Sequence, residues 1–163
     1  MKRKLLSALL ATAMTMTVVA GTGIAVSADG EAVVSTVMFS DPDTMDPGRA
    51  DDDQKNSIVL ECQETLVRLI DGKLTNAGAE SYETSDDGLV WTFHLRDNKY
   101  SDGTPVVAED YVNSIRRVFD PEVNCHNAGI FYCIAGGEAF NTGSGAKEDV
   151  GAKAIDDKTL EIT

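Results

Sequence analysis

The chain has 163 residues, of which 42% are apolar and 25% charged, with 14 Lys and Arg against 27 Asp and Glu. This composition is typical of a globular protein with enough apolar residues for a core, and it excludes a disordered or collagen-like chain. The formal charge of −13 argues against nucleic-acid binding, which requires Lys and Arg to neutralise phosphates.

The first 28 residues have the pattern of a secretory signal peptide. Residues 2–4 are basic, residues 5–19 are mostly apolar, and residues 26–28 supply small side chains for cleavage after Ala28. We therefore expect an exported protein whose mature part, 29–163, carries a formal charge of −16. The alternative is an uncleaved membrane anchor, although the apolar stretch is short for a span of ~20 residues. No cysteine lies near the cleavage point, so no lipid attachment is expected there.

An apolar, β-branched stretch and an acidic loop come next. Residues 32–39 predict a strand, and residues 40–53 contain six aspartates and two prolines. A calcium loop would need a third acidic ligand where Met45 stands, so a solvated acidic loop is the favoured interpretation over a calcium site.

Residues 54–70 predict an amphipathic helix, because apolar residues recur at a spacing of four. Cys62 lies on the apolar stripe and is expected to be buried. The end of this segment, 67–70, can instead be a short strand, because it runs into Asp71-Gly72, a typical hairpin turn.

Two further hairpins and two further helices are predicted. Residues 82–96 form a hairpin around Asp86-Asp87-Gly88, and their second strand alternates, with His94 on its more polar face. The closing hairpin, 150–163, turns at Asp156-Asp157. The helices are 108–119, whose apolar stripe has helical spacing, and 128–135, which Gly136-Gly137 should end.

The sequence contains no recognisable catalytic or cofactor site. The chain has two histidines, His94 and His126, and it lacks a G-x-S-x-G turn. His126 follows Cys125 directly, but adjacent side chains seldom point at each other, so a thiol–imidazole pair is disfavoured. Cys125 and Cys133 are candidates for a disulfide in an oxidising compartment, which would leave Cys62 free or paired outside the chain.

Several segments resemble extracellular solute-binding proteins of family 5, the oligopeptide-, dipeptide- and nickel-binding components of ABC importers. The most specific is the strand WTFHLR at 91–96, followed by the turn YSDGTP at 100–105 and a helix beginning AEDY at 108. Others, in the same order as in the family, are 44–47 (TMDP), 79–88 (AESYETSDDG) and 151–161 (GAKAIDDKTLE). The chain departs from the family at Val107, usually Thr, and at Asn76 and Gly78, where a proline-centred segment is usual.

The resemblance implies an α/β fold of the type II periplasmic-binding-protein kind. It assigns 29–59 to the first strand and loop of the large lobe, 60–148 to a small accessory α/β domain, and 149–163 to a hairpin returning to the large lobe. Family members are several hundred residues longer and close two lobes over the ligand. The chain is therefore expected to be a fragment without the second lobe, which alone binds ligand weakly or not at all.

The resemblance also implies a function and candidate ligand contacts. The contacts are Asp53, Phe131 and Tyr132, although the first can be merely a surface acid and the other two core aromatics. The implied function is capture of solutes, chiefly peptides, outside the cytoplasm and delivery to an ABC permease in the cytoplasmic membrane. We expect a monomer without cofactor or metal. The alternatives are a nonfunctional truncation and, less favoured, a secreted enzyme.

Overall fold

The computed structural model describes residues 41–49 and 53–163. The predicted signal peptide, the predicted strand at 32–39 and residues 50–52 lie outside these ranges. Residues 42–163 form one unit, described here by itself. Its elements in chain order are α2 (Asp53–Cys62), β1 (Val67–Ile70), β2 (Lys73–Asn76), β3 (Ala79–Thr84), β4 (Trp91–Leu95), α3 (Ala108–Val118), η1 (Ala128–Phe131), α4 (Gly137–Asn141), η2 (Lys147–Asp149), β5 (Ala152–Asp156) and β6 (Thr159–Ile162).

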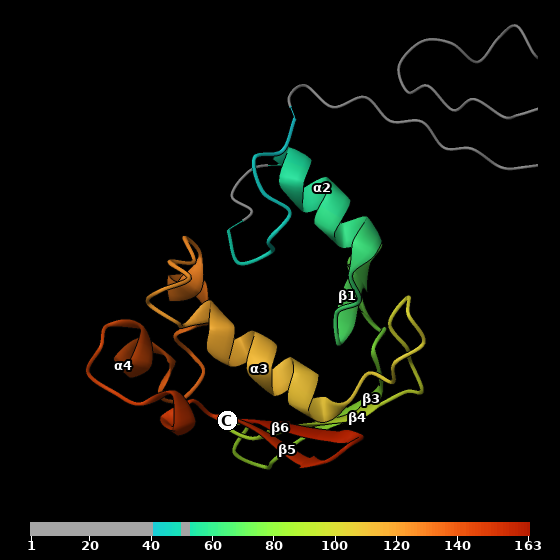
Figure 1. The fold of residues 1–163 in the computed structure, drawn as a ribbon. Helices are drawn as coiled ribbons and strands as arrows, with labels where there is room; N and C mark the ends of the chain where they lie inside the picture. The colour runs from blue at the N-terminus through green and yellow to red at the C-terminus, as the bar shows by residue number, and fades with distance from the viewer. Residues whose placement is uncertain (1–40, 50–52) are drawn as a thin grey trace, which may run out of the picture. The chain divides into compact units, whose positions relative to one another are not determined.

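The strands form two antiparallel sheets, with α3 packed on the larger one (Figure 1). β1 and β2 pair as a hairpin, while the four-stranded sheet has the order β3-β4-β6-β5. The closing hairpin therefore joins the same sheet as β3 and β4, because β6 pairs with β4 along residues 159–162. α3 covers the β5 and β6 half of this sheet.

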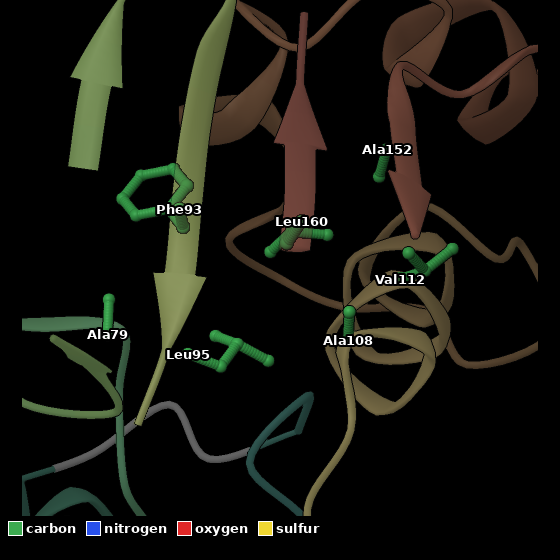
Figure 2. Packing of buried hydrophobic residues seen from close by; sticks show 7 residues of the cluster. All are labelled: Ala79, Phe93, Leu95, Ala108, Val112, Ala152 and Leu160. Atoms are coloured by element: carbon green, nitrogen blue, oxygen red, sulfur yellow. The ribbon is translucent and has the colours of Figure 1, made fainter. Parts of the chain in front are cut away.

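The main core lies between α3 and the four-stranded sheet. Figure 2 shows Leu160 of β6 with Phe93 of β4 on one side and Ala108 and Val112 of α3 on the other. Leu160 is 0% exposed, and burying a leucine side chain stabilises the fold by about 1.5–3 kcal/mol. The buried members of the cluster are Ala79, Phe93, Leu95, Ala108, Val112, Ala152 and Leu160.

A second, smaller core lies beyond the end of α3. Phe119, which is fully buried, packs there with Ala128 and Val150. Gly137, the first residue of α4, makes this packing possible, because a Cβ at that position would lie 2.6 Å from the Phe119 ring. Two predicted ligand-binding residues, Phe131 and Tyr132, belong to the segment after α3. Packing around the buried Phe119 ring holds this segment against the end of α3.

The three predicted hairpins are confirmed. At the first, both turn residues have positive φ, 51° for Asp71 and 73° for Gly72, as a two-residue turn between twisted strands requires. β3–β4 and β5–β6 each contain one register irregularity. The alternating strand buries Phe93 but leaves Trp91 39% exposed.

The helix predicted at 108–119 is confirmed as α3, although its N-cap, Val107, has no side-chain hydrogen bond to offer. Asp110, in the first turn of the helix, supplies a capping hydrogen bond instead, because its Oδ2 accepts the Val107 N–H at 2.9 Å. Arg116 and Arg117 lie in the last turn, where positive charge suits the helix dipole.

Two sequence predictions are wrong. The helix predicted at 54–70 ends at Cys62, and the alternative of a strand at 67–70 is confirmed as β1, but the Cys62 side chain is exposed and not buried as predicted. The helix predicted at 128–135 is only the 3₁₀ turn η1, and α4 occupies 137–141. Gly136 separates them with a left-handed φ of 71°, so it ends one turn and precedes the next.

Two aspartates of the acidic loop form ion pairs. The Asp43 carboxylate lies 2.7 Å from the Lys55 ammonium of α2. Asp46 forms a bidentate pair with Arg117 of α3, with N–O distances of 2.8 and 2.6 Å. Across residues 41–49 and 53–163, no group of three or more His, Cys, Asp or Glu side chains is arranged to hold a metal ion. No helix in the same residues is long and apolar enough to cross a membrane.

Candidate ligand-binding site

The three predicted ligand contacts lie on two different elements. Asp53 is the first residue of α2, and only its backbone is described. Phe131 and Tyr132 lie at the end of η1, after α3. Phe131 and Tyr132 are neighbours in the sequence, and Asp53 lies on a different element.

Phe131 is available to a ligand. Its side chain is 43% exposed and lines an apolar pocket of about 160 Å³ beside α3. The neighbouring Ile130 is 73% exposed. The other residues of the pocket are Ser114, Ile115, Val118, Phe119 and Ile134. A pocket of this composition suits an apolar group.

Tyr132 has the contacts of a core residue. Its ring centroid lies 6.4 Å from that of Phe119, in a tilted arrangement. Its hydroxyl donates to Asn141 Oδ1 at 2.7 Å, and Asn141 Nδ2 donates to the Phe119 carbonyl at 3.0 Å. These bonds fix the segment after α3, and a direct role of Tyr132 in binding stays a prediction.

The chain's three cysteines, Cys62, Cys125 and Cys133, are free thiols in the structure. The predicted disulfide between Cys125 and Cys133 is therefore not formed there. Cys125 is half-buried and packs on the second core, whereas Cys133 is exposed.

A larger groove, of about 500 Å³, lies between the end of α2, the loop 98–106 and the first half of α3. Sequence reasoning missed it, because these three segments are distant in the chain and each has an ordinary local explanation. The groove residues are Pro47, Cys62, Gln63, Glu64, Asn98, Lys99, Tyr100, Ser101, Val106, Asp110, Tyr111 and Ser114.

An ion pair forms one wall of this groove. Glu64 binds the Arg96 guanidinium directly and lies 3.5 Å from Arg68 Nε. Arg96 Nε also donates to the Ala77 carbonyl at 2.6 Å, which fixes the guanidinium. The negative charge of Glu64 is therefore neutralised within the protein.

Two tyrosines, Tyr100 and Tyr111, also line the groove. Burial raises the pKa of Tyr100, and the adjacent Asp110 carboxylate raises it further. Burial and the negative charge of Glu64 likewise raise the pKa of Tyr111. Both hydroxyls therefore stay protonated at neutral pH. Gly78 gives the Tyr111 hydroxyl its room, because a Cβ at position 78 would lie 2.3 Å from the hydroxyl oxygen.

Comparison with known proteins identifies the family. Residues 73–163, more than half of the chain, match the sequence profile described as bacterial extracellular solute-binding proteins, family 5 Middle. The chain belongs to this family. The resemblance found in the sequence is thereby confirmed.

Curated relatives in the family include oligopeptide-binding proteins. The chain is 36% identical over 135 residues to the oligopeptide-binding protein OppA of Bacillus subtilis, covering 82% of this chain and 25% of that protein. It is 40% identical over 128 residues to the periplasmic oligopeptide-binding protein OppA of Escherichia coli, covering 76% and 23%. The chain thus spans about a quarter of the length of these relatives.

Solved structures of family members share the fold. Listeria monocytogenes OppA bound to peptide matches with a TM-score of 0.71 and 40% identity, over 73% of this chain and 24% of that one. The murein tripeptide binding protein MppA in its unliganded open form matches with a TM-score of 0.73 and 31% identity, over 77% and 25%. The predicted α/β fold of the periplasmic-binding-protein kind is confirmed. The division into parts at 59/60 and 148/149 stays a prediction.

Proposed function

We propose that this chain serves in the solute-binding component of an ABC importer, which captures peptides outside the cytoplasm and delivers them to a membrane permease. The observation that carries the proposal is the match, at 40% identity, to Listeria monocytogenes OppA bound to peptide. Other relatives are named for oligopeptides, dipeptides and murein peptides. One is named as a probable deoxycholate-binding protein, so the family name alone does not define the solute.

In this proposal the protein acts by binding and not by catalysis. Family membership supports this, since the family consists of solute-binding proteins. The protein is exported through the signal peptide at 1–28 and works as a monomer outside the cytoplasm, without a cofactor. No nucleic acid takes part, in keeping with the acidic charge of −13.

Phe131 is the residue of this chain that we assign to contact with the peptide. Its half-exposed ring beside the apolar pocket on α3 supports this role, because such a pocket can bury an apolar side chain of the ligand. Asp53, at the start of α2, is assigned to a cationic group of the ligand. Tyr132, the third assigned contact, is held by its hydrogen bond to Asn141.

A chimera tests the proposal. The segment of Bacillus subtilis OppA that matches this chain is replaced by residues 29–163, and the chimera is expressed in cells that lack their own oligopeptide-binding protein. We expect restored uptake of a labelled peptide, because the two segments share a fold and 36% of their residues. Phe131→Ala should reduce uptake severalfold, whereas Ile130→Ala, which changes the exposed neighbour, should leave it within twofold.

Two results would contradict the proposal. If the chimera is exported and folded, as judged by circular dichroism, but binds no peptide, the chain does not serve in peptide capture. If Phe131→Ala and Ile130→Ala have the same small effect, Phe131 is not a ligand contact.

A further inference from the structure

The groove between α2, the loop 98–106 and α3 contains none of the proposed peptide contacts, although it shares Ser114 with the apolar pocket at Phe131. None of Asp53, Phe131 and Tyr132 is among the residues that line it. Its volume of about 500 Å³ falls within the range of ~300–1,000 Å³ that is typical of small-molecule sites. Most of the residues that line it have polar groups, which can hydrogen-bond to a polar occupant.

Three charged side chains line the groove, Glu64, Asp110 and Lys99, and one of the two carboxylates forms no ion pair within the described part of the chain. Glu64 is paired with Arg96 and Arg68. Asp110, in contrast, has no Lys, Arg or His within ion-pair distance among residues 41–49 and 53–163. Its Oδ2 accepts the Val107 N–H, and the carboxylate also accepts a hydrogen bond from the Tyr100 hydroxyl, but neither donor carries a positive charge.

Two aromatic rings accompany this carboxylate. Tyr100, which is half exposed, precedes the Ser101–Val106 turn, and Tyr111 follows Asp110 on α3. Because both hydroxyls remain protonated, the tyrosines contribute no negative charge and present neutral rings and hydrogen-bonding oxygens to the groove. A carboxylate beside tyrosine rings attracts an ammonium group through charge and through the negative faces of the rings.

We propose that this groove binds the primary ammonium group of a small amine-bearing solute, with Asp110 as its anionic partner and Tyr100 and Tyr111 beside it. A divalent cation fits less well, because one unpaired carboxylate supplies too few ligands. The inference does not depend on the proposed function, since neither importer membership nor Phe131 enters the argument.

The test is a titration of the full 163-residue chain, followed by amide chemical shifts in nuclear magnetic resonance. The probes are trialanine, N-acetyl-trialanine and n-butylamine. We expect trialanine to shift amides of residues 98–114 with saturation, and acetylation to weaken binding at least tenfold, because it removes the ammonium charge. If n-butylamine shifts the same amides, a simple amine is sufficient for binding. If trialanine shifts them and n-butylamine does not, the ammonium group must belong to a peptide. Absence of saturable shifts in 98–114 with both amines overturns the proposal.

Variants separate a binding role of Asp110 from its capping role. Asp110→Asn keeps a side-chain oxygen for the Val107 N–H but loses the charge, and it should weaken binding at least tenfold. Glu109→Gln removes a neighbouring exposed carboxylate from the same helix turn and should leave affinity within twofold. Equal affinity of Asp110→Asn and Glu109→Gln refutes the proposal. If Asp110→Asn fails to fold, Tyr100→Ala replaces it, with an expected loss of about two- to fivefold for one exposed ring; unchanged affinity of that variant would refute the proposal as well.

Discussion

Leu160→Ala should strongly destabilise the unit formed by residues 42–163. Leu160 is fully buried on β6, opposite Phe93 of β4 and Ala154 of β5. Removing three carbons of buried side chain costs about 2.4 kcal/mol at ~0.8 kcal/mol per carbon. The cavity left under α3 adds to this, so the expected loss in the free energy of unfolding is about 3–4 kcal/mol.

The assay is urea unfolding of the full chain, followed by tryptophan fluorescence. Trp91 is the chain's single tryptophan and pairs with Ile162 across β4 and β6, so its emission reports on the sheet. The matched control is Leu69→Ala on β1. Leu69 is 73% exposed, so its truncation should change the free energy of unfolding by less than about 0.5 kcal/mol.

Comparing Leu160→Ala with Leu69→Ala also tests whether the closing hairpin packs in the same core as β3 and β4. If β5 and β6 pack with β3, β4 and α3, Leu160→Ala must cost several times more than Leu69→Ala. Equal, small losses for the two variants would refute the reasoning, because they would mean that Leu160 is not part of a core shared with β4.

Two further predictions concern the second core and the acidic loop. Gly137→Ala should cost about 1–3 kcal/mol, because its Cβ would meet the Phe119 ring at 2.6 Å, whereas Gly129→Ala, with nothing within 4 Å, should be nearly neutral in thermal unfolding. The hydrogen bonds from Arg117 lower the pKa of Asp46 below its ordinary 3.8. The stability from this pair is therefore present above that value and is lost as the pH falls through the folded-state pKa. Asp46→Asn should destabilise the protein at neutral pH but not in strong acid, as measured by urea unfolding; an equal loss at both pH values contradicts this assignment.

The sequence by itself determined the features that depend on neighbouring residues. The Asp71-Gly72 turn follows from residues that accept positive φ, and α3 follows from apolar residues at helical spacing between acidic and basic ends. The WTFHLR strand with its turn and helix also sufficed to indicate the family, because that combination is specific.

Tertiary structure decided the features that depend on distant residues. The pattern at 54–70 left open whether its last residues continue the helix or form a strand. They form β1, which pairs with β2, and the helix ends with Cys62 exposed. The segment 128–135 forms only the turn η1, and its Ala128 packs with Phe119 in the second core. Periodicity describes one element at a time and does not reveal these partners.

The groove is the clearest example of a feature that local sequence patterns do not reveal. Asp110 is locally a helix-capping residue, Tyr100 a turn residue and Glu64 a polar residue after a helix. Tertiary structure brings the end of α2, the loop 98–106 and α3 to one groove, in which Glu64 is paired with Arg96 while Asp110 forms no ion pair with any residue that the structure describes. The chemistry of a site depends on which charges meet in space, and that is set by long-range contacts which no local pattern encodes.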